Sequence, residues 1–359
     1  MNLSFLAVEY MDQADRLLLN VNEDERLSAA GKLDKKNLFI QEQKLASNWG
    51  IGLTEATNTL KATTQNFIRS ALHPIERRFK TKNVSLRYNH LKCRFYSDTF
   101  FASVKSNLQN TCAQLFVTDF GYTKFTPMQA KSEAGFALQE LIRDVGIPRE
   151  LHTDGAKELT MGTWKKVCQE AGIKASMTEK NSPWQNRKEV EIRELKQHVR
   201  CLMTRSQTPL PLWDFCCQYV VELQNRIACP LSQLHGRTPY EVLTGNTPDI
   251  SEFLEFRWFQ PIWYYEPSVF PEQNRLMARW LGVAQRVGQA MCFWLLPSSG
   301  APIARTTIQA IAEEELSRDE TKQMIDAFDK LINENNKNDS PRTSLHLYRE
   351  DEIIDEDFD

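Results

Sequence analysis

The sequence predicts an α/β domain with a mixed sheet flanked by helices, placed between a helical N-terminal segment and a small all-β C-terminal domain. Between residues 92 and 203, short runs of alternating apolar and polar residues are interleaved with longer runs of helical periodicity. Glycines and prolines mark the ends of these runs. The length of 359 residues also exceeds what one hydrophobic core usually serves, so we expect two or three domains.

Periodicity and composition divide the chain into five regions. We expect a helical extension of unreadable function at 1–43, a basic helical segment at 44–91, the α/β core at 92–250, a small β-barrel-like domain at 251–312, and an acidic tail at 313–359. The tail is predicted to be helical at first and then disordered, because it becomes rich in acids and asparagine.

The first predicted strand, at 92–104, carries a carboxylate on its apolar side. Asp98 shares that side with Tyr96 and Phe100. A carboxylate in such a position is costly unless it is paired or bound to a cation. Two further strands, at 113–118 and 124–128, are predicted around a turn at Gly121.

Asp119 is an alternative to Asp98 as the first functional acid. It follows the second strand directly and precedes the turn at Gly121. If Asp119 took this role, only one strand would precede the helix, and the sheet would be a strand short. We therefore predict that Asp119 is a turn residue.

A second acid stands at the end of the fourth predicted strand. A helix that begins at Ser132 and is stopped by Gly146 and Pro148 leads into this strand, which ends on Asp154. In open α/β sheets the carboxyl ends of the strands are where ligands and metals are usually held. A helix at 164–171 that ends at Gly172, and a strand at 173–178, come next.

A third acid lies in the long helix predicted at 187–203. Its apolar stripe contains Ile192, Leu195, Val199, Leu202 and Met203, and beside it runs a basic stripe of Arg193, Lys196 and Arg200. Glu189 lies within the basic stripe, where an ordinary solvated i,i+4 pair is one interpretation. The 34 residues between Asp154 and Glu189 favour a second one, because they suffice for one helix, one strand and one loop. Glu191 is the alternative acid, but it lies at the far edge of the apolar stripe.

Four segments now permit a comparison with a known family: Asp154–Leu159, Ser182–Arg187, Glu189–Lys196 and Gly236–Gly245. They resemble the catalytic core of retroviral-type integrases of the DDE superfamily, nearest to copia-type LTR retrotransposons, and the segment that follows that core. The resemblance covers about residues 45–249 and implies a ribonuclease H-like fold within a fragment of a Pol polyprotein. The chain departs from the family in having Arg187 where many relatives have Gly, and in an acid spacing that is one residue shorter.

The resemblance implies that Asp98, Asp154 and Glu189 are catalytic residues and metal ligands. Their hard oxygen donors suit two Mg²⁺ or Mn²⁺ ions, which about 4 Å apart can support an in-line phosphoryl displacement. By resemblance, the enzyme trims the 3′ ends of the element's DNA and joins them to a target duplex, as a homo-oligomer in the nucleus after a cytoplasmic particle stage. The candidate nucleic-acid contacts are Lys157, Arg187, Lys188, Arg193, Lys196 and Arg200.

The charge and the cysteine content limit the functions that the sequence allows. The net charge of −3 is the sum of +7 for residues 1–312 and −10 for residues 313–359. Residues 44–94 contain 10 basic and 2 acidic residues. Such a basic segment is typical of a region that binds a polyanion, but also of a solvent-exposed helical face. The eight cysteines include no C-x-x-C pair, and only His73, His90 and Cys93 could belong to a zinc module, so we do not expect zinc. No apolar run is long enough for a membrane span. A domesticated, inactive DNA-binding remnant and a nuclease that cuts without joining are the alternative functions.

Overall fold

The computed structural model describes residues 35–66, 83–154, 156, 159, 161–177, 187–228, 234–266, 274–284 and 291–337. Side chains are described from 41 onward, from 190 in the helix that begins at 187, and as far as 335. The chain divides into two compact units, residues 1–57 and 58–359. No described helix has the length and apolar character that a membrane crossing requires.

The first unit contains α3 (Lys35–Trp49) and the start of α4 (Leu53–Ala62), which continues into the second unit. Gly50 follows α3 with a φ of +68°, a conformation that glycine adopts without a steric penalty. The Gly52 amide donates a hydrogen bond to Glu55 Oε2 at 3.1 Å. This is the reciprocal half of a capping box, and it satisfies a backbone donor where α4 begins.

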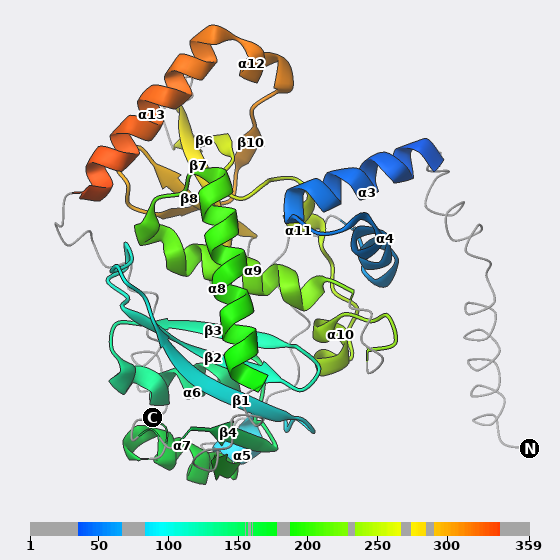
Figure 1. Cartoon of the computed structure of the whole chain (residues 1–359), viewed down its shortest axis with the longest axis vertical. Helices are drawn as coiled ribbons and strands as arrows, with labels where there is room; N and C mark the ends of the chain where they lie inside the picture. The colour runs from blue at the N-terminus through cyan, green and yellow to red at the C-terminus, as the bar shows by residue number, and fades with distance from the viewer. Residues whose placement is uncertain are drawn as a thin grey trace, which may run out of the picture. The chain divides into compact units, whose positions relative to one another are not determined.

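The larger unit contains a five-stranded mixed sheet, with the order β3-β2-β1-β4-β5 (Figure 1). Its strands are β1 (Arg94–Phe101), β2 (Cys112–Thr118), β3 (Thr123–Met128), β4 (Glu150–Thr153) and β5 (Lys174–Met177). The first three are antiparallel neighbours, while β4 and β5 continue the sheet in parallel from β1. Three antiparallel strands followed by two parallel ones that helices connect is the ribonuclease H-like order, so the predicted fold class is confirmed.

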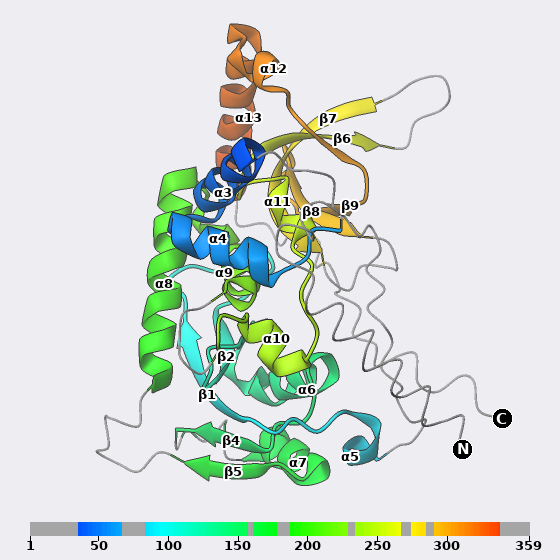
Figure 2. The ribbon, with the colours of Figure 1, turned by 90° about the vertical axis from the view of Figure 1, so that its right-hand side faces the viewer.

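The helices α6 (Ala134–Asp144) and α7 (Gly162–Ala171) pack on one face of this sheet (Figure 2). The Trp164 ring stacks on Phe116 of β2 with centroids 6.1 Å apart. Gly135 lets the two helices approach, because a Cβ atom there would lie 2.7 Å from Cβ of Thr163. Gly172 ends α7 with a φ of +70°, as predicted.

The start of α6 differs from the prediction. Ser132 does not cap it, because residues 131–133 form a 3₁₀ turn, η1 (Lys131–Glu133), and α6 begins at Ala134. The Glu133 side chain instead accepts a hydrogen bond from the Gln129 amide at 3.0 Å. The Glu133 carboxylate thus bonds to the chain that precedes the helix, and this stabilises the start of the helix without a serine cap.

The opposite face of the sheet is covered by α8 (Arg187–Ser206) and α9 (Trp213–Arg226), which η4 (Leu210–Leu212) connects. Trp213 makes edge contacts with Phe100 of β1 and Phe125 of β3, with centroids 6.3 and 6.4 Å apart. Asn225 exchanges two hydrogen bonds with the backbone of Thr123, at 2.8 and 2.7 Å. A side chain of α9 therefore satisfies backbone groups at the outer edge of β3.

The C-terminal part contains a five-stranded antiparallel sheet, with the order β10-β6-β7-β8-β9. Its strands are β6 (Pro261–Glu266), β7 (Asn274–Ala284), β8 (Cys292–Pro297), β9 (Ile303–Arg305) and β10 (Ile308–Ala310). A flat sheet would separate the two edge strands by about 19 Å, since neighbouring strands lie about 4.8 Å apart. The chain from Arg305 to Ile308 spans at most about 11 Å. The sheet must therefore curl until its edges approach each other, while the predicted barrel remains a prediction.

Further helices join and extend these parts. Before β1 lies α5 (Val84–Arg87); α10 (Pro239–Thr244) and α11 (Ser251–Leu254) connect α9 to the second sheet; α12 (Glu313–Ser317) and α13 (Asp319–Lys337) follow it. The predicted helical start of the tail is thus confirmed, while residues 338–359 lie outside the described part.

Candidate active site

The register of the sheet brings two of the predicted acids to the same level. Ser97 of β1 pairs with Thr153, the last residue of β4, and the next residue along the chain is an acid in both cases, Asp98 and Asp154. Neighbouring strands lie about 4.8 Å apart. The two carboxylates therefore leave adjacent strands side by side, where β4 ends.

Both carboxylates face the side of the sheet that α8 and α9 cover. Phe95 and Leu151 are buried in the core with α6 and α7, so residues one or three further along each strand belong to the other face. Asp98 pairs with Leu115, and Leu115 pairs with Phe125, whose ring contacts Trp213 of α9. The helix that carries the third predicted acid thus lies over the face to which the first two belong.

The third acid is placed only by its backbone. Glu189 is the third residue of α8, and its side chain lies outside the described residues. The two predicted stripes of this helix are nevertheless visible: Ile192, Leu195, Val199 and Met203 are buried, Leu202 is half-buried, and Arg193 and Arg200 are exposed. Glu191 is half-buried beside this apolar stripe. The choice of Glu189 over Glu191 remains a prediction.

Asp119 lies where it was predicted, in the exposed turn between β2 and β3. The Gly121 amide bonds to the Thr118 carbonyl at 3.1 Å and closes that turn. Asp98 by contrast lies in the middle of the sheet, with β2 on one side and the end of β4 on the other.

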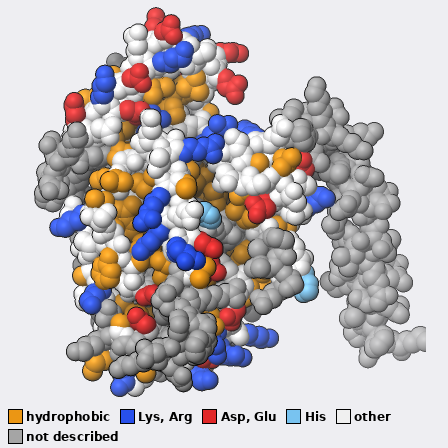
Figure 3. All heavy atoms as spheres, viewed as in Figure 1, with side chains coloured by type: hydrophobic (Ala, Val, Ile, Leu, Met, Phe, Trp, Pro, Cys, Tyr) orange, Lys and Arg blue, Asp and Glu red, His pale blue; other side chains and the backbone are white. Residues whose placement is uncertain are grey.

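A groove of about 550 Å³ runs between Asp98 and α8. It is lined by Asp98, Thr99, Phe100, Phe101, Ile192, Arg193, Lys196 and Arg200. Lys196 Nζ lies 4.7 Å from the centroid of the Phe100 ring, a cation–π contact that fixes the ammonium group over β1. Burial lowers the pKa of Lys196, and Arg200 adds to this, while the charge of Asp98 acts in the opposite direction. Figure 3 shows Lys and Arg side chains gathered over α8.

Backbone amides hold the two carboxylates locally. Asp98 Oδ1 accepts a hydrogen bond from the Thr99 amide at 2.8 Å, and Asp154 Oδ1 accepts one from the Ala156 amide at 3.3 Å. The second bond has the i,i+2 spacing of an Asx-turn, which turns the chain away at the end of β4.

Sequence analysis did not identify a polar network that lies beside the acids, towards the start of β4. Glu150 is buried and pairs with Arg94 at 3.0 Å and with Lys174 at 3.8 Å. Ser176 Oγ donates to Glu150 Oε1 at 2.9 Å and lies 2.9 Å from His152 Nδ1. Because the single hydroxyl proton goes to Glu150, His152 Nδ1 is the donor to Ser176.

This network links three strands across their direction. Burial raises the pKa of Glu150, but hydrogen bonds from Ser176 and Arg94 and the charges of Arg94 and Lys174 outweigh it, so the pKa lies below its usual value. Glu150, His152 and Asp154 alternate along β4, and that period of two is the sequence signal that could have revealed the network. An ionised Glu150 therefore ties β1, β4 and β5 together just beneath the acid pair.

The remaining predicted contacts are only partly described. Lys157 lies outside the described residues, as do the side chains of Arg187 and Lys188. Among the phosphate-binding candidates, Arg193, Lys196 and Arg200 do come together, along the groove. Of the residues weighed for a zinc module, His73 lies outside the described part, and His90 Nε2 is 2.8 Å from the Ser85 carbonyl oxygen.

The donor chemistry suits a hard divalent cation. Within the described residues no group of three or more His, Cys, Asp and Glu side chains is close enough to hold a metal ion, but that set leaves out the Glu189 side chain. Asp98 and Asp154 supply only oxygen donors, which Mg²⁺ and Mn²⁺ prefer over Zn²⁺. The residues present therefore fit the predicted metal.

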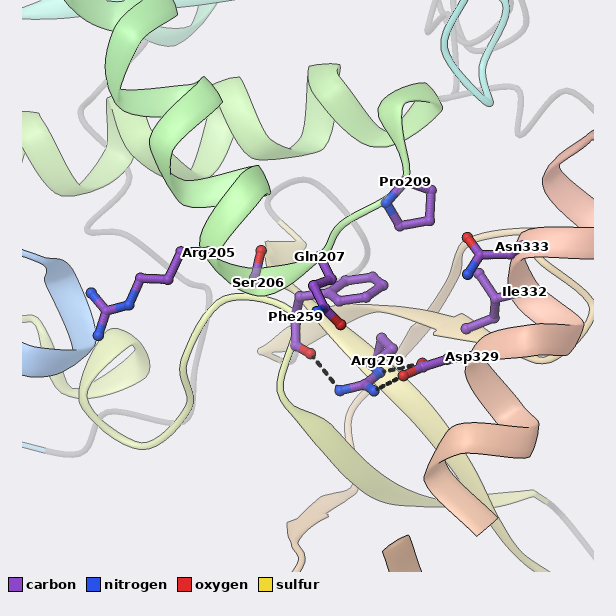
Figure 4. Close-up of a pocket in the computed structure, with 9 residues that line it drawn as sticks. All are labelled: Arg205, Ser206, Gln207, Pro209, Phe259, Arg279, Asp329, Ile332 and Asn333. Atoms are coloured by element: carbon purple, nitrogen blue, oxygen red, sulfur yellow. Dashed lines mark hydrogen bonds and ion pairs between the residues drawn. The ribbon is translucent and has the colours of Figure 1, made fainter. Parts of the chain in front are cut away.

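A second hollow, of about 210 Å³, lies near the C-terminal end of α8. Figure 4 shows that Arg279 of β7 directs its guanidinium to Asp329 of α13 and to the carbonyl of Phe259. All three of these bonds are internal to the C-terminal part. We interpret this hollow as the site of a structural ion pair that fixes α13 on the second sheet.

Comparisons with known proteins add one structural likeness. The sequence matches no protein-family model and no curated protein. Among solved structures, the chain is similar to the catalytic core domain of BIV integrase, with 17% identical residues and a TM-score of 0.34. The similar region covers 42% of this chain and 93% of that domain.

Proposed function

We propose that this protein is an integrase of the retrotransposon type, which uses divalent metal to trim DNA 3′ ends and to join them to target DNA. The observation that supports this most directly is the register of β1 and β4, which sets Asp98 beside Asp154 on the face that α8 covers. The copia-type motifs around Asp154 and Glu189 support the finer assignment. Nuclear localisation and assembly into a homo-oligomer belong to the same proposal.

The chain's residues have two tasks in this reaction. Asp98, Asp154 and Glu189 would hold the metal through carboxylate oxygens, and a bound divalent ion would activate the attacking oxygen and stabilise the leaving one. Arg193, Lys196 and Arg200 neutralise the phosphates of the DNA strand that lies in the groove. No side-chain nucleophile is needed, because water attacks during trimming and the DNA 3′-hydroxyl attacks during joining.

The test uses the full chain and a labelled DNA duplex that carries the element's end sequence. Wild type with Mg²⁺ or Mn²⁺ should give both a shortened strand and a joined product. Asp98→Asn, Asp154→Asn and Glu189→Gln should each lower both products by orders of magnitude while DNA binding persists, since each removes a charge that holds the ion.

Asp119→Asn is the matched control, because it neutralises an exposed acid in the turn beyond β2. Glu191→Gln tests whether Glu189 or Glu191 is the third acid. Full activity in the Glu189 variant with loss in the Glu191 variant would show that the wrong helix position was chosen. A wild type that trims without joining would be a nuclease, and one that binds DNA but does neither would be the inactive remnant.

A further inference from the structure

The face of the core sheet that carries the acid pair extends from β1 onto β4 and β5. Two rows of paired polar residues lead along this face towards the acids: Arg94, Glu150 and Lys174, then Tyr96, His152 and Ser176. Residues two apart along a strand belong to the same face, so both rows share the face of Asp98 and Asp154. We call these six residues the polar shelf.

The polar shelf is accessible to solvent, unlike the part of the same face that lies under the helices. Leu115 of β2 and Phe125 of β3 are buried where α8 and α9 pack. On the shelf, the Lys174 side chain is 74% exposed and the Arg94 side chain 38% exposed. The three residues of the second row are half-buried. A ligand that reaches the acids can therefore also contact the shelf.

The two cations of the shelf are held in place by a buried carboxylate. Glu150 lies 3.0 Å from Arg94 and 3.8 Å from Lys174, and its single negative charge leaves one positive charge in excess. Because the pairing restricts the two long side chains, they lose less rotamer entropy when they bind a phosphate. Tyr96 and Ser176 add hydroxyl groups, which also contact DNA phosphates in known complexes. The shelf thus has the chemistry of a site for a sugar–phosphate backbone.

The geometry of an in-line displacement separates the two DNA partners of the joining reaction. The attacking 3′-hydroxyl and the leaving oxygen lie on opposite sides of the phosphorus, so the DNA end and the target strand approach the acids from different sides. The groove beside Asp98 lies towards α8, which packs on β1 and β2. The shelf extends the other way, from β1 across β4 to β5. The acid pair therefore has one cationic site on each side.

The shapes of these two sites indicate which DNA each one takes. The wall that α8 forms beside Asp98 suits a strand that ends there. Target DNA has no end at the site and must continue in both directions, which requires an open face such as the shelf. The row of Lys174 lies four strand residues from the acid row, or about 13 Å, which is the length of about four base pairs along a duplex.

We propose that the polar shelf binds the backbone of the target duplex about four base pairs from the phosphate that is attacked, with Lys174 as its main contact. This proposal rests on the proposed function, because it assigns to the shelf one of the two DNA partners of the joining reaction. It gives Lys174 a binding role and no part in the chemistry.

The first experiment compares trimming with joining in the full chain with Mg²⁺, using a labelled element-end duplex and increasing concentrations of a target duplex. Trimming uses no target and should be unchanged in Lys174→Ala. Joining by this variant should need about three- to tenfold more target for half of its maximal rate, because one phosphate contact is lost. Lys174→Arg keeps the charge and should restore the target dependence of wild type.

Lys166→Ala is the matched control. The Lys166 side chain is 76% exposed and lies 3.8 Å from Glu170, which closely resembles the exposure and pairing of Lys174. Lys166 belongs to α7, which packs on the other face of the sheet. Removal of its charge should therefore change neither trimming nor joining.

The second experiment measures binding in EDTA to a closed circular duplex, which has no ends and undergoes no reaction. The slope of log affinity against log salt should fall by about 1 in Lys174→Ala and stay unchanged in Lys166→Ala. The proposal is overturned if Lys174→Ala keeps the wild-type slope, or if its trimming falls as much as its joining. A wild type that neither trims nor joins refutes the integrase proposal, and the slope then decides whether the shelf binds DNA.

Discussion

Stability should depend on pH through a buried ion cluster that lies away from the candidate active site. Arg226 at the end of α9 pairs with Glu222 and, at 3.8 Å, with Glu252 of α11. The Glu252 side chain is 18% exposed. Burial raises the pKa of Glu252 from 4.5 to about 7; Arg226 opposes this, while the charges of Glu222 and Asp249 reinforce it.

The sign of the effect follows from the direction of that shift. Because the pKa is higher in the folded state than in the unfolded state, the folded protein binds an extra proton between pH 4.5 and about 7. The stabilisation from this proton is fully present below pH 4.5 and is lost as pH rises through about 7. Between pH 5 and pH 8 the free energy of unfolding should fall by about 2 to 3 kcal/mol from this group alone.

Glu252→Gln should remove this dependence, because glutamine keeps the shape of the side chain and does not ionise. Urea unfolding of wild type and variant at pH 5 and pH 8 measures it: the stability of the variant relative to wild type should improve by about 2 to 3 kcal/mol on going to pH 8. Glu255→Gln, at an exposed position three residues away, is the control. An equal difference between Glu252→Gln and wild type at both pH values would refute the reasoning.

Three other predictions concern the metal, the basic stripe and the core. Millimolar Mg²⁺ should raise the melting temperature of wild type and not that of Asp154→Asn, because a cation relieves the repulsion between neighbouring carboxylates. Arg193→Ala and Arg200→Ala should each reduce the slope of log affinity for DNA against log salt by about 1, as measured by fluorescence anisotropy. Gly135→Ala should cost about 1 to 3 kcal/mol in urea unfolding, because the new methyl group meets Thr163 and the two helices must move apart.

The fold of the core could be predicted from the sequence because its signals are local. Period-two alternation defines the strands, and the apolar stripe of α8 is buried as its 3.6-residue spacing requires. Gly172 has a positive φ, which glycine adopts readily, so this one residue was enough to predict the end of α7. Ser132 shows the limit of such signals, because a cap residue identifies a helix start only when the chain approaches it in an extended conformation, and here a 3₁₀ turn precedes α6.

The polar clusters could not be predicted, because their members are far apart in the chain. Ser176 and Glu150 are 26 residues apart, and Asn110 bonds to the buried Asp214 across 104 residues. The sequence shows that a charged residue occupies an apolar stretch, but it does not show which distant side chain satisfies it. Burial of Arg226 among Glu222, Glu252 and the Phe253 ring is a contact of this kind, fixed only when α9 and α11 pack.

The candidate active site falls between these two cases, because the sequence places two of its acids on strands but does not show the space beside them. Alternation along β1 already placed Asp98 on an apolar side, where a carboxylate needs a cation, and the position of Asp154 at a strand end needs only the strand itself. The short length of β4 thus places Asp154 at a strand end beside Asp98 and leaves the edge of β1 beyond Ser97 without pairing to β4.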